Sequence, residues 1–242
     1  MKTLTIAKHK GGVGASTLTW ALSSIWSETL KVLVWDFDPQ GTLSMAFCGS
    51  SQPTGYEVLS GQCTIEEAIA NVLPTYNQNL KVVPASGMLA RLDVETASRF
   101  DRAHIVTDAL ERLKSEFDLV VMDTPPAEGS VLTIGPQVAS DFVLLPCSCD
   151  DASFQQVPRF HKTVEVLKQR LNPKLNLLPF VANLYDHRQI MDRKVLLALR
   201  SSYQVFQTVI PKRVSIKEEM ANGIPCTNLE MRDLASEILE KI

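Results

Sequence analysis

The sequence predicts an α/β fold in which a mostly parallel, twisted sheet carries helices on both faces. Short, almost wholly apolar runs alternate with longer stretches in which apolar residues recur every three or four positions. Strands of the first kind are buried on both faces, as in parallel sheets covered by helices. The chain has 242 residues, of which 45% are hydrophobic and 21% charged, and this composition suits a globular protein with a full core.

The first expected strand is "TLTIA" at residues 3–7, followed by a glycine-rich turn and a helix at about 16–28. The next strand, "KVLVWDFD" at 31–38, ends in two carboxylates. Further strands are expected at 80–86, 117–123, 141–147 and 175–183, and amphipathic helices at 103–115 and 155–170. Residues 48–79 are the least periodic, and we expect small helices there over one edge of the sheet. Without a repeat, low-complexity tract or linker, the sequence predicts a single domain spanning residues 1–242.

Charge and cysteine content exclude several classes of protein. A net charge of −3 argues against a protein that coats nucleic acid with its whole surface, although a local basic patch is compatible with it. Five scattered cysteines are typical of reduced thiols in a cytosol. Cys147 and Cys149 have no second Cys/His pair at zinc-like spacing, so we expect no metal there. The N-terminus lacks the apolar run of a signal peptide, and no stretch reaches 18 apolar residues.

The loop after the first strand has the character of a phosphate-binding site. Its glycines are Gly11, Gly12 and Gly14. They let backbone N–H groups turn inward, and the N-terminus of the following helix adds its positive dipole end. This combination favours an anion such as a triphosphate. Ser16 and Thr17 open the helix: both could be N-caps, but beside this loop we favour the Ser16 hydroxyl as a Mg²⁺ ligand.

Three carboxylates follow strands of the predicted sheet. Asp36 and Asp38 lie at the end of the second strand, and Asp123 closes the run "LVVM". Ligands of such sheets bind beyond the carboxyl ends of the strands. The pair at 36 and 38 could consist of solvated turn formers, but next to a phosphate loop we expect these residues to order Mg²⁺ and an attacking water.

The segments that carry this chemistry resemble the ParA/MinD family of deviant Walker-box P-loop ATPases. Residues 10–16, "KGGVGAS", are similar to the family's first box, K-G-G-x-G-K-[ST], and "WDFDPQGTLS" at 35–44 resembles its second, D-x-D-P-Q-G. Residues 120–146 resemble its Walker B strand with the helix and strand that follow, and 205–225 its late pattern. The resemblance runs from the first strand to the last helix.

This resemblance implies a P-loop NTPase fold that binds ATP or ADP with Mg²⁺. Lys10 resembles the signature lysine, which crosses an ATP-sandwich dimer to the partner's phosphates, and Asp38 resembles the carboxylate needed for hydrolysis. The family does not use the first glycine of the ordinary loop, which accounts for His9. The implied metal ligands are Ser16, Asp36 and Asp123. The implied nucleotide-binding residues are Lys10, Gly11, Gly12, Val13, Gly14, Ala15, Ser16, Thr17, Asn183 and Pro211. For Asn183, a simple strand-end cap is an equal alternative to a contact with adenine.

Ala15 departs from the family, because the P-loop lysine belongs at this position. That lysine contacts the β- and γ-phosphates. Either an engineered lysine-to-alanine change or a natural pseudo-ATPase explains the alanine, and retention of the other site residues favours the first. Under both explanations we expect little or no ATP hydrolysis and weakened nucleotide binding, together with weaker ATP-dependent dimerisation and DNA binding.

Two branches of the family differ in what they bind. MinD-like regulators end in a basic amphipathic helix that lies on the membrane, whereas residues 228–242 carry four acids and two bases, so we expect a helix that closes the fold. The segment 186–217 contains seven basic residues and two acidic ones, which gives it a local net charge of +5. In ParA-like proteins this region binds duplex DNA without reading its sequence. The candidate DNA-binding residues are Arg188, Lys194, Lys212 and Arg213.

The favoured interpretation is a ParA-type ATPase in the cytoplasm, associated with the nucleoid and not with membrane. As a homodimer formed on ATP binding, it would position or segregate a plasmid, chromosome or carboxysome-like cargo through a ParB-like adaptor protein. The alternative is a MinD-like membrane-associated regulator. A third class comprises metabolic relatives, an ATP-dependent ligase or an iron–sulfur reductase. The reductase is disfavoured because Cys147 and Cys149 both follow a single strand.

Overall fold

The computed structural model describes residues 1–8, 10–113 and 116–242. Within these ranges, a seven-stranded sheet has the order β3-β4-β2-β5-β1-β6-β8, and β7 and β9 form a separate parallel pair. Apart from β3, which is antiparallel to β4, the strands of the large sheet pair in parallel, which confirms the predicted fold class. The strands are β1 (Lys2–Ile6), β2 (Val32–Asp36), β3 (Ala70–Asn71), β4 (Leu80–Val83), β5 (Leu119–Asp123), β6 (Phe142–Leu144), β7 (Pro146–Ser148), β8 (Asn176–Leu177) and β9 (Val181–Asn183).

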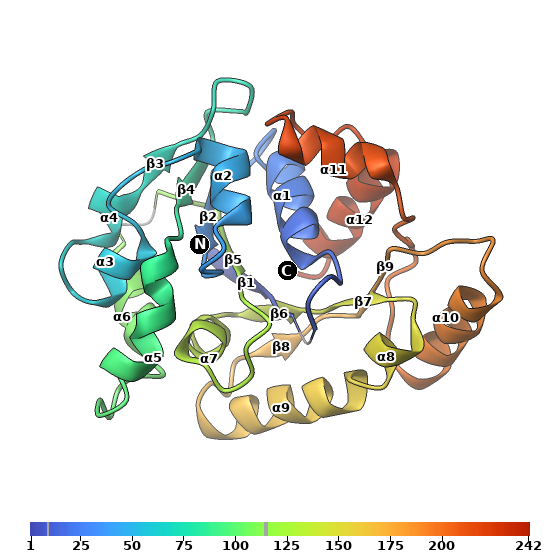
Figure 1. Cartoon of the computed structure of the whole chain (residues 1–242). Helices are drawn as coiled ribbons and strands as arrows, with labels where there is room; N and C mark the ends of the chain where they lie inside the picture. The colour runs from blue at the N-terminus through green and yellow to red at the C-terminus, as the bar shows by residue number, and fades with distance from the viewer. Residues whose placement is uncertain (9, 114–115) are drawn as a thin grey trace.

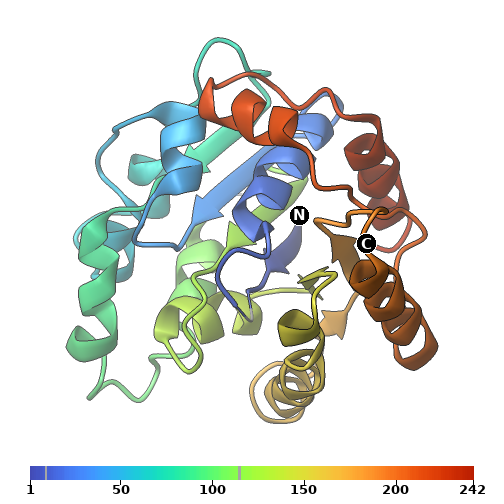
Figure 2. The ribbon, with the colours of Figure 1, turned by 45° about the vertical axis from the view of Figure 1, so that its right-hand side comes forward.

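Helices cover both faces of the sheet (Figures 1 and 2). One layer consists of α1 (Ala15–Trp26), α2 (Thr42–Cys48), α11 (Val214–Ala221) and α12 (Leu229–Leu239). The opposite side carries α3 (Gly55–Leu59), α4 (Ile65–Ala68), η1 (Gly87–Arg91), α5 (Leu92–Glu95), α6 (Ile105–Arg112), α7 (Val131–Val138) and α9 (Val157–Arg170). Beside the β7–β9 pair lie α8 (Asp151–Phe154) and α10 (Ile190–Ser202). In Figure 2, α9 (gold) is seen nearly end-on, across the molecule from α11 and α12 (red).

The central strands are apolar throughout because both of their faces are buried. In β2, Val34 packs in the cluster that includes α1 and α12, while Leu33 packs on the other side with α6. In β5, Val121 packs on the side of α1 and α12, and Val120 packs on the side of α6. A two-residue period thus builds a core on each side of one sheet.

The C-terminal helix closes the fold, as expected. Leu234 and Ile238 of α12 are fully buried and share a core cluster with residues of α1. The Trp26 indole N–H also donates a hydrogen bond to the Ala235 carbonyl, 3.1 Å away. The apolar stripe of this helix is therefore used in the core. Among the described residues, we find no helix with the length and apolar character that crossing a membrane requires.

The observed elements differ from the expected ones in a few places. The expected strands 141–147 and 175–183 are each divided, and their second halves, β7 and β9, pair with each other. Proline has no N–H to donate to a ladder, and Pro146 stands where the first strand divides. Residues 48–79 contain the small helices α3 and α4, but also the edge strand β3, which we did not expect. His9, and the end of the expected helix 103–115 at residues 114–115, lie outside the described residues.

Candidate nucleotide site

Strand register brings the site together. Ile6 of β1 pairs with Asp123 of β5, and Asp123 pairs with Asp36 of β2. Three central strands therefore end at one level, and the loops that follow them share one edge of the sheet. This is the edge at which parallel α/β sheets bind their ligands.

The glycine-rich loop has a backbone that side chains would disrupt. Gly12 and Gly14 have φ values of 83° and 80°, in the left-handed region that favours glycine. A Cβ on Gly14 would lie 2.7 Å from Asn183 Nδ2, closer than a side chain allows. Gly14 is also the N-cap of α1. Glycine at position 14 thus permits both the tight turn of the loop and the close packing of the loop against β9.

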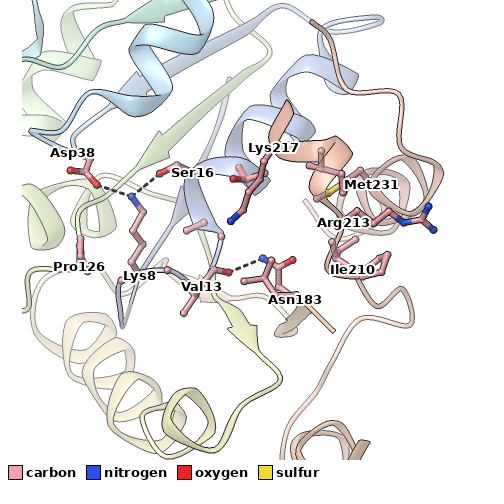
Figure 3. A pocket seen from close by; sticks show the side chains of 18 residues that line it. Lys8, Val13, Ser16, Asp38, Pro126, Asn183, Ile210, Arg213, Lys217 and Met231 are labelled. Atoms are coloured by element: carbon pink, nitrogen blue, oxygen red, sulfur yellow. Dashed lines mark hydrogen bonds and ion pairs between the residues drawn. The ribbon is translucent and has the colours of Figure 1, made fainter. Parts of the chain in front are cut away.

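A cavity of about 280 Å³ opens beside this loop (Figure 3). Its walls are the loop itself, the ends of β2 and β9, and the segment that leads into α11 and α12. The lining residues are 11–17 of the loop with Lys8, Asp38, Pro126, Asn183, Leu184, Ile210, Pro211, Arg213, Ile216, Lys217 and Met231. Most of the nucleotide-binding residues expected from the sequence line this one cavity. Lys10 does not.

A lysine that the sequence reasoning missed occupies the centre of the site. Lys8 Nζ donates hydrogen bonds to Ser16 Oγ at 2.8 Å, Asp38 Oδ2 at 2.9 Å and Asp123 Oδ2 at 3.1 Å. Ser16 Oγ in turn donates to Asp123 Oδ2 at 2.7 Å. The Lys8 side chain is 8% exposed, and Asp123 is fully buried. A signal was present in the sequence, because Lys8 directly follows a buried strand at the edge where ligands bind.

The charges of this cluster alter one another's protonation. Burial lowers the pKa of the Lys8 ammonium, but Asp123 and Asp38 outweigh burial, and the net pKa is raised. Burial raises the pKa of the Asp123 carboxyl, with Lys8 opposing the rise. Burial also raises the pKa of the Asp36 carboxyl to about 7, and the Asp123 charge adds to that rise. Two of these carboxylates, Asp38 and Asp123, thus share the Lys8 ammonium.

Asp36, which we expect from the resemblance to be a metal ligand, has its carboxylate oxygens engaged by neighbouring residues of the chain. It is fully buried and is not among the residues that line the cavity. Its Oδ2 accepts hydrogen bonds from the Ser44 hydroxyl at 2.7 Å and the Ser44 N–H at 3.0 Å, and its Oδ1 accepts one from the Asp38 N–H. Asp36 therefore holds the turn that presents Asp38, because its oxygens are already directed at that turn. The structure brings together Ser16, Asp38 and Asp123 instead.

Asn183 links β9 to the loop. Its Nδ2 donates a hydrogen bond to the Val13 carbonyl at 2.7 Å, while its Oδ1 is buried without a hydrogen-bond partner (Figure 3). A simple cap would use this side chain on the end of its own strand, whereas here it reaches across to the loop. Asn183 and Pro211 both line the cavity, while the Oδ1 atom itself is buried. A buried acceptor of this kind calls for a donor from a ligand or a water.

Lys10 points to a different place from Lys8. Its Nζ lies 3.6 Å from Asp150 Oδ1, and both side chains are about half exposed. Together with Gly11, Gly12 and Lys212 it lines a second depression, next to Cys149 and Asp192. The loop therefore directs one lysine into the molecule and another toward its surface.

The basic residues expected to bind DNA do not form one uniform patch. Arg188 is bound to Asp186 through its Nε and Nη2 atoms, at 2.9 and 2.8 Å. Arg213 is 2.5 Å from Glu230, and Lys217 lines the nucleotide cavity. Lys194 on α10 and Lys212 are exposed. Part of the local charge of +5 is thus neutralised by acids or directed toward the cavity.

The cysteines of the described residues are free thiols. Burial raises the pKa of Cys147 and that of Cys149 to about 12. Within the same residues, no group of three or more His, Cys, Asp or Glu side chains is arranged to hold a metal ion by itself.

Comparison with known proteins places this site in a family. A family model described as an AAA domain matches residues 1–177. The chain is 32% identical over 227 residues to the chromosome partitioning protein ParA of Myxococcus xanthus, covering 91% of this chain and 78% of that one. It is 29% identical to the ParA of Caulobacter vibrioides, covering 100% and 92%.

A solved structure supports the fold over nearly the whole chain. The structure called cobyrinic acid a,c-diamide synthase, from Mycobacterium smegmatis with bound ATP analogue and magnesium, has a TM-score of 0.86 and 27% identity. The match covers 99% of this chain and 94% of that one. Given the extent of the sequence match to the partition proteins and the P-loop geometry at the sheet edge, this chain belongs to the ParA family of P-loop ATPases.

Proposed function

We propose that this protein is a ParA-type positioning ATPase, acting as one domain over residues 1–242. ATP and Mg²⁺ bind in the cavity beside the glycine-rich loop and close a homodimer. The dimer binds double-stranded DNA without reading its sequence, in the cytoplasm at the nucleoid. A ParB-like adaptor on the cargo stimulates hydrolysis and release. The observation that carries this proposal is the cavity itself, which joins a phosphate-type loop to an unpaired buried acceptor on β9.

The two ends of the cavity suit the two ends of ATP. The loop N–H groups and the N-terminus of α1 receive the phosphates. At the other end, Asn183 Oδ1 accepts a hydrogen bond from the amino group of adenine, and Pro211 packs on the base. Its present bond to Val13 holds the Asn183 side chain ready for this contact.

The oxygens around Lys8 fit a divalent cation. Ser16 Oγ, Asp38 Oδ2 and Asp123 Oδ2 all lie within 3.1 Å of the same ammonium nitrogen, so they already converge on a positive charge. Mg²⁺ prefers oxygen ligands of this kind, and when bound beside phosphates it neutralises their charge during transfer. Ser16 and Asp123 would hold it. Asp38, whose side chain is 17% exposed, is placed to accept a hydrogen bond from the attacking water.

Lys10 contacts the nucleotide of the partner protomer in the dimer. Its side chain is 45% exposed, and its contact with Asp150 is long at 3.6 Å, so little holds it on its own chain. A lysine in this position is free to reach the phosphates bound by a second protomer.

Hydrolysis by this chain is slow because Ala15 provides no ammonium at the start of α1. The direct test is steady-state ATP turnover by this protein and by its Ala15→Lys variant, each with and without DNA. We expect the variant to hydrolyse ATP at least about tenfold faster, since one electrostatic contact to the transferring phosphoryl group is worth that much or more. Equal rates would contradict the proposal.

DNA binding rests on the exposed basic residues of the segment 186–217. A titration of duplex DNA with and without ATP, at several salt concentrations, tests it. Contacts to phosphates make affinity fall steeply with salt. We expect tighter binding with ATP and a clear salt dependence, and an affinity unaffected by salt would remove this part of the proposal.

The same titration separates the alternatives. A MinD-like regulator would float with anionic liposomes in the presence of ATP and ignore DNA. A metabolic ligase related to the M. smegmatis synthase would bind ATP without response to either DNA or liposomes. The use of the α12 apolar stripe in the core disfavours the first of these.

A further inference from the structure

We propose that Lys8 supplies the phosphate-binding ammonium that Ala15 lacks. This inference rests on the proposed binding of ATP in the cavity. For the binding of ATP, a phosphate-binding lysine is thus not lost from this site: it enters from the end of β1. The contact that a lysine in the first turn of α1 makes with the transferring phosphoryl group is still missing, so hydrolysis stays slow.

The position of Lys8 is the first argument. Lys8 and Ala15 line the same cavity, and Lys8 Nζ is 2.8 Å from the hydroxyl of Ser16, the residue next to Ala15. Figure 3 shows the Lys8 side chain rising from the strand end toward Ser16 and Asp38, in front of the first turn of α1. An ammonium group therefore lies beside the first turn of α1, although residue 15 carries no charge.

The charge balance of the cavity is the second argument. Asp38 and Asp123 are at this end of the site, and without Lys8 a triphosphate would meet carboxylates at the same edge. Of the other described basic residues that line the cavity, Arg213 is ion-paired with Glu230, and Figure 3 shows its guanidinium directed away from the loop. Lys217 reaches in from α11, and its Nζ lies between Ser16 and Asn183 in Figure 3. Lys8 is the lysine bound to Ser16, Asp38 and Asp123.

A change of partner then follows from the chemistry of the ligands. Ser16, Asp38 and Asp123 now receive the Lys8 ammonium, and the first and last are also the oxygens suited to a divalent cation. Two cations do not share one set of ligands, because like charges at this distance repel. With the oxygens of Ser16 and Asp123 engaged by a divalent cation, the Lys8 ammonium would be free to turn to the phosphates. A lysine suits this exchange because its charge is carried on a flexible four-carbon stem.

The rival explanation is that Lys8 only neutralises a buried carboxylate and stabilises the fold. The two explanations differ in what happens when a lysine is restored at position 15. A phosphate-binding Lys8 becomes redundant with Lys at 15, whereas a purely structural Lys8 keeps the same importance.

The experiment is a double-mutant cycle on ATP affinity. Four proteins are compared by isothermal titration with ATP and Mg²⁺: the wild type, Lys8→Met, Ala15→Lys and the double variant. We expect Lys8→Met to weaken ATP binding about 10- to 100-fold in the wild-type background, the usual effect of removing a charged hydrogen-bond donor. With lysine at 15, the same change should cost less than about threefold. An equal loss in both backgrounds, or no loss in the wild type, overturns the proposal.

Two controls sharpen the cycle. Lys217→Met removes another ammonium of the same cavity, and its effect should be the same in both backgrounds. Titration with AMP in place of ATP should show little dependence on Lys8, because AMP has no β- or γ-phosphate.

The double variant also provides a test if Lys8→Met alone does not fold. It keeps one ammonium at the site, and we expect it to bind ATP within about threefold of the wild type. If it binds ATP tenfold or more tightly than the wild type, Lys8 has been contributing nothing to phosphate binding. If Ala15→Lys binds ATP and the wild type does not, this inference fails while the proposed site stands. If none of the four binds ATP, the proposed function itself fails.

Discussion

Basic residues occur beside acids both at the sheet edge around Lys8 and in the segment 186–217, with opposite consequences. Lys8 is 8% exposed and binds two carboxylates and a hydroxyl, whereas Arg188 is 79% exposed and binds Asp186, two residues before it in the sequence. Charges that are removed from water interact strongly, and charges at the surface are screened by water and salt. The number of charged residues in a stretch of sequence therefore does not show where charges interact strongly in the folded protein.

The largest effect is expected from Asp123→Ala. This change removes the acceptor of Lys8 Nζ, Ser16 Oγ and Thr19 Oγ1 in a fully buried position. We expect a loss of about 3–5 kcal/mol in the free energy of unfolding, as for other broken buried ion pairs. Urea unfolding followed by circular dichroism measures it.

The matched control removes an aspartate from the surface. Asp233 on α12 is exposed, and Asp233→Ala should change the free energy of unfolding by no more than about 0.5 kcal/mol. Similar losses in the two variants would mean that the edge around Lys8 is no more sensitive than the surface.

Gly14→Ala should come next. The added Cβ meets Asn183 Nδ2, and alanine must adopt a φ of 80°. The left-handed backbone alone costs about 1–2 kcal/mol in stability. Because Asn183 has to move, adenine nucleotides should also bind more weakly, and titration with adenosine measures this loss apart from the phosphates. Adenosine affinity equal to that of the wild type would show that Asn183 does not contact the base.

A smaller effect is expected where surface acids neutralise the basic segment. Arg188 holds the pKa of Asp186 well below its usual range, so this aspartate is ionised wherever DNA binding is measured. Asp186→Asn removes that charge and releases Arg188. We expect DNA affinity to rise several-fold at low salt, with a dependence on salt concentration steeper by about one counterion. Fluorescence anisotropy of labelled duplex DNA measures both. Weaker binding after the change would place Arg188 outside the DNA interface.

The smallest effect on stability is expected at the contact between Lys10 and Asp150. Asp150 also caps α8 through a hydrogen bond from the Ser153 N–H, and asparagine caps helices equally well. Asp150→Asn should therefore alter stability by less than about 1 kcal/mol. It frees Lys10, so the ATP concentration required for dimerisation should fall, as measured by analytical ultracentrifugation. An unchanged or higher requirement would mean that Asp150 does not compete for Lys10.

The fold was largely predictable from the sequence because apolar runs such as "VLVW" and "LVVM" are typical of strands buried on both faces. The glycine spacing at 11, 12 and 14 and the carboxylates at strand ends predicted the edge where the cavity lies. Hydrogen-bond partners were not predictable in this way. Asp36 and Asp38 are separated by a single residue, yet only Asp38 lines the cavity, because Ser44 binds Asp36.

Other features depend on contacts between distant segments. Lys8 and Asp123 are 115 residues apart, and nothing local in the sequence pairs them. The ion pair of Arg213 with Glu230 likewise depends on how the segment before α11 lies against α12. The division that leaves β7 and β9 as a pair apart from the large sheet also depends on contacts between segments distant in the sequence. The spacing of apolar residues shows which face of a helix or strand is buried. The features above depend instead on which helices and strands become neighbours in the fold.

The place of β1 in the sheet affects how the chain is made. β1 is the first strand of the chain, yet both of its neighbours, β5 and β6, begin more than a hundred residues later, with Lys2 opposite Leu119. During synthesis, about half of the protein must therefore emerge before the first strand finds a partner. Pairings over such separations are slow to form and leave strand edges open for longer. The nucleotide site, which depends on β1 and β5 together, is completed only after that delay.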